Sequence, residues 1–296
     1  MFIRTISLAF IFSFHVVNVA NAKQMLQVDT LQTIQTFDAR QGVAVDKDHF
    51  YAVNSFRITK HQKYDGKAIL QWDGVSDETG PLIHLDSGMV WQGKLYASHS
   101  NYPNWPMTSS VEVWDTQTLK HIESHSFGSE LGSFTWLDRH NGFWWGGFAN
   151  YDKVQKGQTQ AYGLTMNTQV VKMDDNFKIL NKWSIPTAVL KRFSPMSNSG
   201  GSLGSDGYFY LTGHDLPEIY VMALPEFGSE LTWVDTIVAP EIHGQGIAWD
   251  RSEKERILWG IRKKDRLVFK MKVPKVSVQH TKQVHGIRTV GEFNTQ

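Results

Sequence analysis

Histidine is the residue type in this sequence best suited to chemistry near neutral pH. His99, His214 and His243 each lie in a polar segment beside a short apolar run. One imidazole can accept or donate a proton, because its ordinary pKa is about 6.5, and three that converge can bind a metal ion. We predict His214 and His243 as catalytic proton-transfer residues. A divalent metal on His99, His214 and His243 stays open, as does the interpretation that each is an ordinary polar side chain; no other cofactor is predicted.

Positive charges provide a second group of candidates. Arg57 and Arg262, with Lys263 beside the latter, also follow apolar runs. Arginine presents a planar fork of donors that fits a carboxylate or phosphate, so we predict that Arg57 and Arg262 bind an anionic ligand. A lyase or cycloisomerase requires a cation that stabilises an enolate and a base that moves its proton. Taken singly, each arginine could simply be solvated.

Carboxylates indicate a different chemistry. Asp38, Asp86 and Glu241 each precede an apolar run by a few residues. Two carboxyl groups held apart across a sugar can protonate the leaving group and activate water, as glycoside hydrolases do. The other interpretation is that each carboxylate accepts hydrogen bonds from loop amides.

Amide and aromatic side chains could orient a ligand. The hexapeptides "QGVAVD" and "QGIAWD", near opposite ends of the chain, are almost the same. We predict that their first residues, Gln41 and Gln245, orient the ligand; alternatively, each binds a neighbouring backbone. Tyr102 lies in "NYPNWP", where the prolines favour a loop. We predict that Tyr102 and His99 also bind substrate.

The elements that must position these residues are short strands that repeat along the chain. Aligning the glycine that opens each apolar run gives five copies with steps of 46, 44, 69 and 45 residues, at Gly42, Gly88, Gly132, Gly201 and Gly246. Four strands in about 45 residues are the unit of a β-propeller blade. In the first unit we predict "AILQWD" as the third strand and "PLIHLD" as the fourth. The surplus of the longest step falls in two loops, 150–167 and 186–201.

The fold prediction is therefore all-β: a five-bladed β-propeller with four-stranded blades. The fifth unit lacks a fourth strand, whereas "DTLQTIQTF" (29–37) precedes the first unit. We predict that this N-terminal strand closes the last blade, because closure removes the exposed edges of an open sheet. Loops before the inner strands and loops between second and third strands then share one face, where long loops are typical of a functional site.

The repeat pattern over residues 29–273 resembles the secreted bacterial propeller proteins with YVTN, lactonising-enzyme and quinoprotein-like repeats. The "WD" that closes "AILQWD" and "SVEVWD" is also similar to WD-repeat blades. The resemblance implies a propeller whose activity could be that of a lactonising enzyme, a sugar lyase, a glutaminyl cyclase or a binding scaffold. It is specific for the fold rather than for one of these activities.

Composition and the first residues bear on location and partners. The 296-residue chain has a net charge of +1 and no cysteine, so neither nucleic acid nor a disulfide framework is expected. Arg4, an apolar run and "ANA" ending at Ala22 are typical of a signal peptide. We predict a signal peptide over 1–22, the propeller over 23–273, a C-terminal tail over 274–296 and no transmembrane segment. The expected location is periplasmic or secreted.

Together these patterns predict an exported propeller enzyme that acts on a small anionic or sugar-like substrate by lyase-type or isomerase-type proton transfer. Two alternatives stay open. One is a non-catalytic periplasmic propeller that binds a ligand or a protein partner. The other is a glycoside hydrolase that uses Asp38, Asp86 and Glu241.

Overall fold

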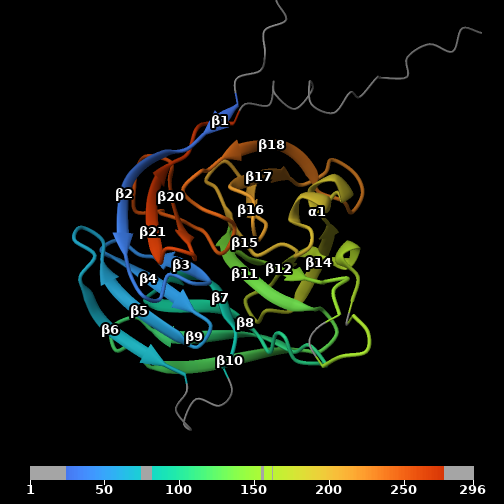
Figure 1. Cartoon of the computed structure of the whole chain (residues 1–296), viewed down its shortest axis with the longest axis horizontal. Coiled ribbons are helices and arrows are strands. Elements are labelled where there is room, and N and C mark those ends of the chain that lie inside the picture. The colour runs from blue at the N-terminus through green and yellow to red at the C-terminus, as the bar shows by residue number, and fades with distance from the viewer. Residues whose placement is uncertain (1–24, 75–81, 155–156, 162, 277–296) are drawn as a thin grey trace, which may run out of the picture.

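Five sheets are arranged as a ring around a central axis (Figure 1). The computed structural model describes residues 25–74, 82–154, 157–161 and 163–276. The predicted five-bladed β-propeller with four-stranded blades is confirmed. No helix within the described segments is long and apolar enough to cross a membrane. The predicted signal peptide lies outside the described residues, as does the tail beyond residue 276.

The first blade differs from the prediction in the segments that form its third and fourth strands. It consists of β3 (Gly42–Val45), β4 (His49–Asn54), β5 (Arg57–Gln62) and β6 (Ala68–Asp73). Its third strand is "RITKHQ", so "AILQWD" is the fourth strand rather than the third. "PLIHLD" is therefore not an outer strand, and its last residues instead begin the inner strand of the second blade. The mostly polar composition of "RITKHQ" hid this strand, because Lys60 and His61 are buried although their residue types usually lie at the surface.

The next three blades follow the predicted order. Blade 2 contains β7 (Leu85–Trp91), β8 (Lys94–Ser100), β9 (Ser109–Asp115) and β10 (His121–Gly128). Blade 3 contains β11 (Ser133–His140), β12 (Phe143–Ala149), β13 (Gln169–Met173) and β14 (Ile179–Ser184). Blade 4 contains β15 (Gly200–Leu203), β16 (Phe209–Thr212), β17 (Glu218–Ala223) and β18 (Thr232–Val238). The 3-10 helix η1 (Thr165–Asn167) and the helix α1 (Thr187–Phe193) lie in the two long loops of the 69-residue step.

The last blade is closed by the N-terminal strand, as predicted. It contains β19 (Ala248–Trp249), β20 (Ile257–Arg262), β21 (Leu267–Lys272) and, outermost, β2 (Asp29–Gln35). β2 runs antiparallel to β21, with Thr30 opposite Met271 and Gln35 opposite Leu267. A preceding strand, β1 (Leu26–Gln27), pairs in parallel with β18 of blade 4. The N-terminal segment therefore joins two neighbouring blades.

The hydrophobic core is divided into five clusters, one between each pair of neighbouring blades. Successive side chains of a strand point to opposite faces, so one strand contributes to two clusters. In β12, Trp144 packs toward blade 2 and Trp145 toward blade 4. This two-sided burial explains why the chain uses so many large aromatic residues in strands.

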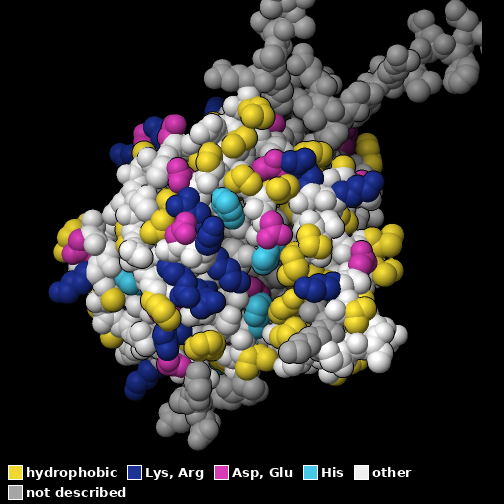
Figure 2. Space-filling model, in the orientation of Figure 1, with side chains coloured by type: hydrophobic (Ala, Val, Ile, Leu, Met, Phe, Trp, Pro, Cys, Tyr) yellow, Lys and Arg dark blue, Asp and Glu magenta, His cyan; other side chains and the backbone are white. Residues whose placement is uncertain are grey.

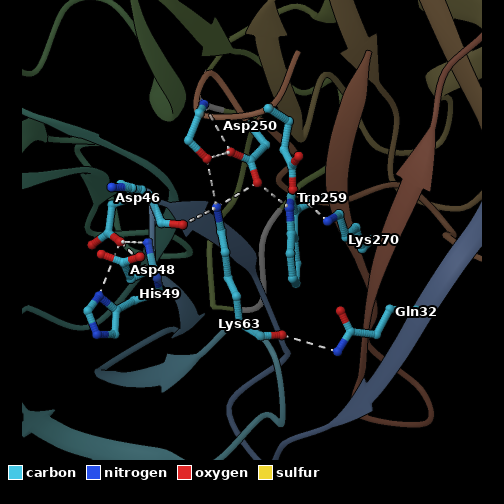
Figure 3. A network of polar contacts seen from close by, with 11 residues as sticks. Gln32, Asp46, Asp48, His49, Lys63, Asp250, Trp259 and Lys270 are labelled. Atoms are coloured by element: carbon cyan, nitrogen blue, oxygen red, sulfur yellow. Dashed lines mark hydrogen bonds and ion pairs between the residues drawn. The ribbon is translucent and has the colours of Figure 1, made fainter. Parts of the chain in front are cut away.

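The junction of blades 1 and 5 carries a buried ion pair (Figure 3). Lys63 Nζ lies 2.6 Å from Asp250 Oδ2, and their side chains are only 12% and 1% exposed. Trp259 Nε1 donates to the same carboxylate oxygen at 3.1 Å, and Gln32 of β2 donates to the Lys63 carbonyl. The network links the closing strand, the first blade and the last blade.

Removal of β2 should prevent folding. A chain that begins at Ala39 loses β1 and β2 and leaves the edge of β21 unpaired, so we expect it to be insoluble. A chain that begins at Asp29 loses only β1 and should fold with a lower melting temperature. Circular dichroism melting compares both with the chain that lacks residues 1–22. An Ala39 chain that melts like the longer one would refute the closure by β2.

Substitution of Lys63 should destabilise the ring. Lys63→Met leaves the Asp250 carboxylate buried without its cation, and we expect a loss of about 3 kcal/mol in unfolding free energy. Lys272→Met is the matched control, because Lys272 and Glu255 form an ion pair in which both side chains are exposed, and its urea midpoint should hardly move. Equal midpoints for the two variants would contradict a role for the buried pair.

Candidate functional site

A cavity of about 230 Å³ lies at one mouth of the central channel, and each blade contributes to its wall. It is smaller than the roughly 300–1,000 Å³ typical of sites for drug-sized ligands, so a ligand would have to be small. Most of the residues lining it come from loops before the inner strands and loops between second and third strands, as the sequence predicted, whereas Asp86 and Thr135 lie near the start of the inner strands β7 and β11. The lining residues are Gln41, His84, Asp86, Tyr102, Thr135, Tyr151, Met196, Ser199, His214, Gln245 and Lys263.

Asp86 is the buried acid of the cavity. Asp86 is 5% exposed, and its Oδ2 atom is buried without a hydrogen-bond partner. Burial raises the pKa of this carboxyl well above its usual range, while the charge of Lys263 acts in the opposite direction. A carboxyl group with a raised pKa can donate and accept protons closer to neutral pH than an ordinary aspartate.

His84 lies directly beside this carboxyl. Its Nε2 atom is 3.5 Å from Asp86 Oδ1. Burial, followed by the positive charges of Lys263 and His99, lowers the pKa of His84 to about 3. His84 is therefore a neutral imidazole at neutral pH, with one ring nitrogen that can donate and one that can accept a hydrogen bond.

Lys263 brings a positive charge to the cavity from the turn between β20 and β21. Among the described residues, no hydrogen bond or ion pair holds its side chain. Burial lowers the pKa of Lys263, and so do the charges of Arg40 and Arg266, whereas Asp86 and Asp215 raise it. Figure 2 shows Lys and Arg side chains gathered around the middle of this face, with His side chains opposite them.

Aromatic rings form another part of the wall. The Tyr102 ring lies 5.0 Å from the His84 ring and 5.5 Å from the Tyr151 ring, measured between centroids. Burial, and then the nearby Asp86 charge, raises the pKa of Tyr151. Tyr151 therefore keeps its phenolic proton at neutral pH. His214 also lines the cavity, and its Nδ1 atom lies 2.6 Å from the Asp215 carboxylate.

The two predicted glutamines lie together at the mouth. Gln41 O accepts a hydrogen bond from Gly246 N at 2.8 Å, so the two similar hexapeptides meet at the junction of blades 1 and 5. Gln41 Nε2 donates to Ser55 Oγ at 2.7 Å, whereas Gln245 O accepts from Thr212 Oγ1 of blade 4. The backbone of Gln245 has φ of +70°, a left-handed conformation that is strained for a residue with a side chain. Strain of this kind is often found at functional sites.

The structure brings together some predicted site residues and separates others. Gln41, Gln245, His214 and Tyr102 line the cavity, but Arg57, Arg262, His99 and His243 are not among its lining residues. Three of these four have other partners: Arg57 with Asp73, Arg262 with Asp265 and Glu241, and His99 with Ser110. His243 is exposed on the loop before β19.

The three carboxylates considered for glycoside hydrolysis are not assembled at the cavity. Only Asp86 lines it. Asp38 is buried beneath the surface and accepts hydrogen bonds from Asn54 and Thr59, and Glu241 lies 3.6 Å from Arg262. In the part of the chain that the structure describes, no three His, Asp or Glu side chains are placed to hold a metal ion.

Sequence reasoning missed the role of His84. The residue lies in "PLIHLD", which was assigned to an outer strand of the first blade. The signal that could have found it is "RITKHQ": once this run is the third strand, His84 falls in the loop before an inner strand. Thr135 and Met196 were also missed, because neither residue type indicates chemistry by itself.

Comparisons with known proteins support the fold. A solved luciferin-regenerating enzyme is similar with a TM-score of 0.51 at 13% sequence identity, over 82% of this chain and 94% of that chain. A PQQ-bound aldose sugar dehydrogenase from Streptomyces coelicolor has a TM-score of 0.48 at 11% identity, over 85% of this chain and 82% of that chain. No protein-family model matches the sequence, and no curated protein matches it. The likeness to the luciferin-regenerating enzyme supports the propeller fold alone, and membership of the predicted repeat group stays a prediction.

The burial of Asp86 should make stability depend on pH. Because the folded-state pKa is raised, the contribution of Asp86 to stability is fully present below the ordinary Asp pKa of about 4 and is lost as pH rises through the folded-state value. Asp86→Asn should therefore raise the melting temperature at neutral pH, and this gain should vanish near pH 4. Calorimetry at several pH values measures the difference. A gain that is the same at all pH values would show that charge is not its cause.

Proposed function

We propose that this protein is an exported propeller enzyme that acts on a small anionic substrate by proton-transfer chemistry of lyase or isomerase type. The observation that carries the proposal is the buried Asp86 carboxyl, whose Oδ2 atom has no hydrogen-bond partner, in a cavity shared with the Lys263 amine. Buried polar groups without partners are costly, so a site that retains them favours a ligand that supplies the missing contacts.

The chemical roles follow from charge and position. Lys263 attracts the anion and stabilises the negative charge that develops when a C–H bond next to a carbonyl is broken. Asp86 takes or returns the proton, with neutral His84 beside it. Gln41 and Gln245 orient the ligand, Tyr102 contacts it, and His214 lies at the same cavity as a further proton-transfer group.

The size and charge of the cavity favour a small acid over a longer sugar. A volume of about 230 Å³ leaves little space for several sugar rings. The positive charges of Arg40 and Arg266 next to Lys263 favour a carboxylate. The substrate class we propose is accordingly a small carboxylic acid with an acidic C–H bond.

Proton exchange with solvent tests this function. The protein is incubated in D₂O with malonate, acetoacetate or pyruvate, and loss of the C–H signal is followed by proton NMR. We expect exchange with at least one acid, and Asp86→Asn should slow it by about 100-fold or more, as removal of a general base does.

Matched variants separate catalysis from binding. Lys263→Met should abolish exchange and weaken binding in calorimetry, whereas Lys264→Met, which changes the exposed next residue, should leave both unchanged. Binding that depends on Lys263 without any exchange would favour the non-catalytic binding propeller. Absence of both binding and exchange for all three acids would refute the proposed function.

A further inference from the structure

We propose that Lys263 forms a Schiff base with a small 2-oxo acid, so that its amine acts as a nucleophile in addition to supplying positive charge for the anion. This inference rests on the proposed function and assigns it a substrate class and a covalent step. Its basis is threefold: a Lys263 side chain with no hydrogen bond or ion pair among the described residues, the Asp86 Oδ2 atom without a hydrogen-bond partner in the same cavity, and the positive charges of Arg40 and Arg266 near Lys263.

Lys263 differs from the other shielded lysines of the ring. Lys60 Nζ donates to the Thr116 carbonyl at 2.8 Å, and Lys63 Nζ is paired with Asp250 at 2.6 Å. Both are structural contacts between strands and turns. Lys263 has neither type of contact among the described residues, although it lines a cavity rather than open surface. Its amine is therefore free to react with a ligand.

The surroundings of Lys263 favour the neutral amine that a nucleophile requires. Burial lowers the pKa of Lys263, as do the nearby charges of Arg40 and Arg266, while Asp86 and Asp215 oppose the shift. A lysine that is desolvated next to other cations is the usual arrangement for Schiff-base chemistry. His84, which lies beside the cavity acid, is neutral and adds no charge, and Tyr151 keeps its phenolic proton because burial raises its pKa.

The covalent step can be written with the groups at the cavity. The lone pair of Lys263 Nζ attacks the C2 carbonyl carbon of the acid, and a proton moves from nitrogen to oxygen to give a carbinolamine. The Asp86 carboxyl donates its proton to the departing hydroxyl, water leaves, and a protonated Schiff base and an Asp86 carboxylate remain. The carboxylate can then remove a proton from C3 to give the enamine. No oxidant or reductant is consumed.

The charges of Arg40 and Arg266 favour a 2-oxo acid over a simple aldehyde. The C1 carboxylate of a 2-oxo acid needs a positive partner once Lys263 is engaged at C2, and Arg40 and Arg266 supply positive charge close to Lys263. The cavity volume of about 230 Å³ suits an acid of a few carbons.

Reductive trapping tests the inference. The protein is mixed with pyruvate or glyoxylate and sodium cyanoborohydride at neutral pH, which reduces a Schiff base to a stable secondary amine. Mass spectrometry of the intact chain and of its peptides then locates the adduct. We expect one adduct on Lys263 with at least one of the two acids, ahead of any adduct on Lys264.

The variants Lys263→Arg and Lys264→Arg, together with the exchange experiment in D₂O, separate the covalent step from the proposed function. Lys263→Arg keeps the positive charge but cannot form the Schiff base, so the adduct should be lost while circular dichroism shows a folded protein. Lys264→Arg should retain the adduct. Equal labelling of Lys263 and the surface lysines, or no adduct with either acid, would overturn the inference. If exchange in D₂O persists without trapping, the covalent step is wrong and the proposed function stands; if both fail, both are refuted.

Discussion

The inner strands of the propeller meet at the axis with backbone against backbone, and this close approach constrains the rest of the ring. A Cβ atom on Gly42 would lie 2.7 Å from the Asp86 carbonyl oxygen, and one on Gly246 would lie 2.8 Å from the Gly42 Cα atom. Neither position has room for a side chain. The repeated hexapeptide at residues 41–46 and 245–250 is thus explained in part by geometry, because two strands that touch at this point need the same glycine.

The cavity at the channel mouth is a consequence of this close contact between inner strands. Where the inner strands converge, the residues just before their glycines surround the channel mouth, as Gln41 and Gln245 do, and Asp86 lies two residues before Gly88. These side chains are shielded from water by the neighbouring blades, and shielding is what raises the pKa of Asp86. The arrangement that closes the ring therefore also creates a buried carboxyl with a raised pKa, at a cost to stability at neutral pH.

Repetition made the architecture predictable, whereas the ion pairs of individual side chains were not. Glycine spacing and alternating apolar residues revealed the blade number and the closing strand, since both depend on local periodicity. Arg57 and Arg262 were predicted as site residues from their type and from their position in loops between second and third strands. Asp73 and Asp265 compete for these arginines, and the contact that decides between a ligand and a carboxylate depends on side-chain geometry that periodicity does not encode.

A misassigned strand explains why the sequence did not predict His84 at the cavity. One misassigned strand in blade 1 moved this residue from the channel mouth to the periphery, because a shift by one strand reverses the face on which a loop lies. Buried polar residues such as Lys60 and His61 in β5 disguise a strand as a loop. Aligning whole four-stranded units, rather than only their opening glycines, would have corrected the assignment.

The N-terminal segment crosses from blade 4 to blade 5 on the outside of the ring, and the last described residues return to the same place. β1 pairs with β18, β2 pairs with β21, and Val276 packs in one cluster with Val28 (Figure 1). Both strands lie at the outer edges of their blades, far from the channel mouth. A tag, a surface linker or a second protein joined directly at residue 25 or residue 276 would therefore start away from the cavity, which makes the propeller suited to immobilisation without loss of access for small molecules.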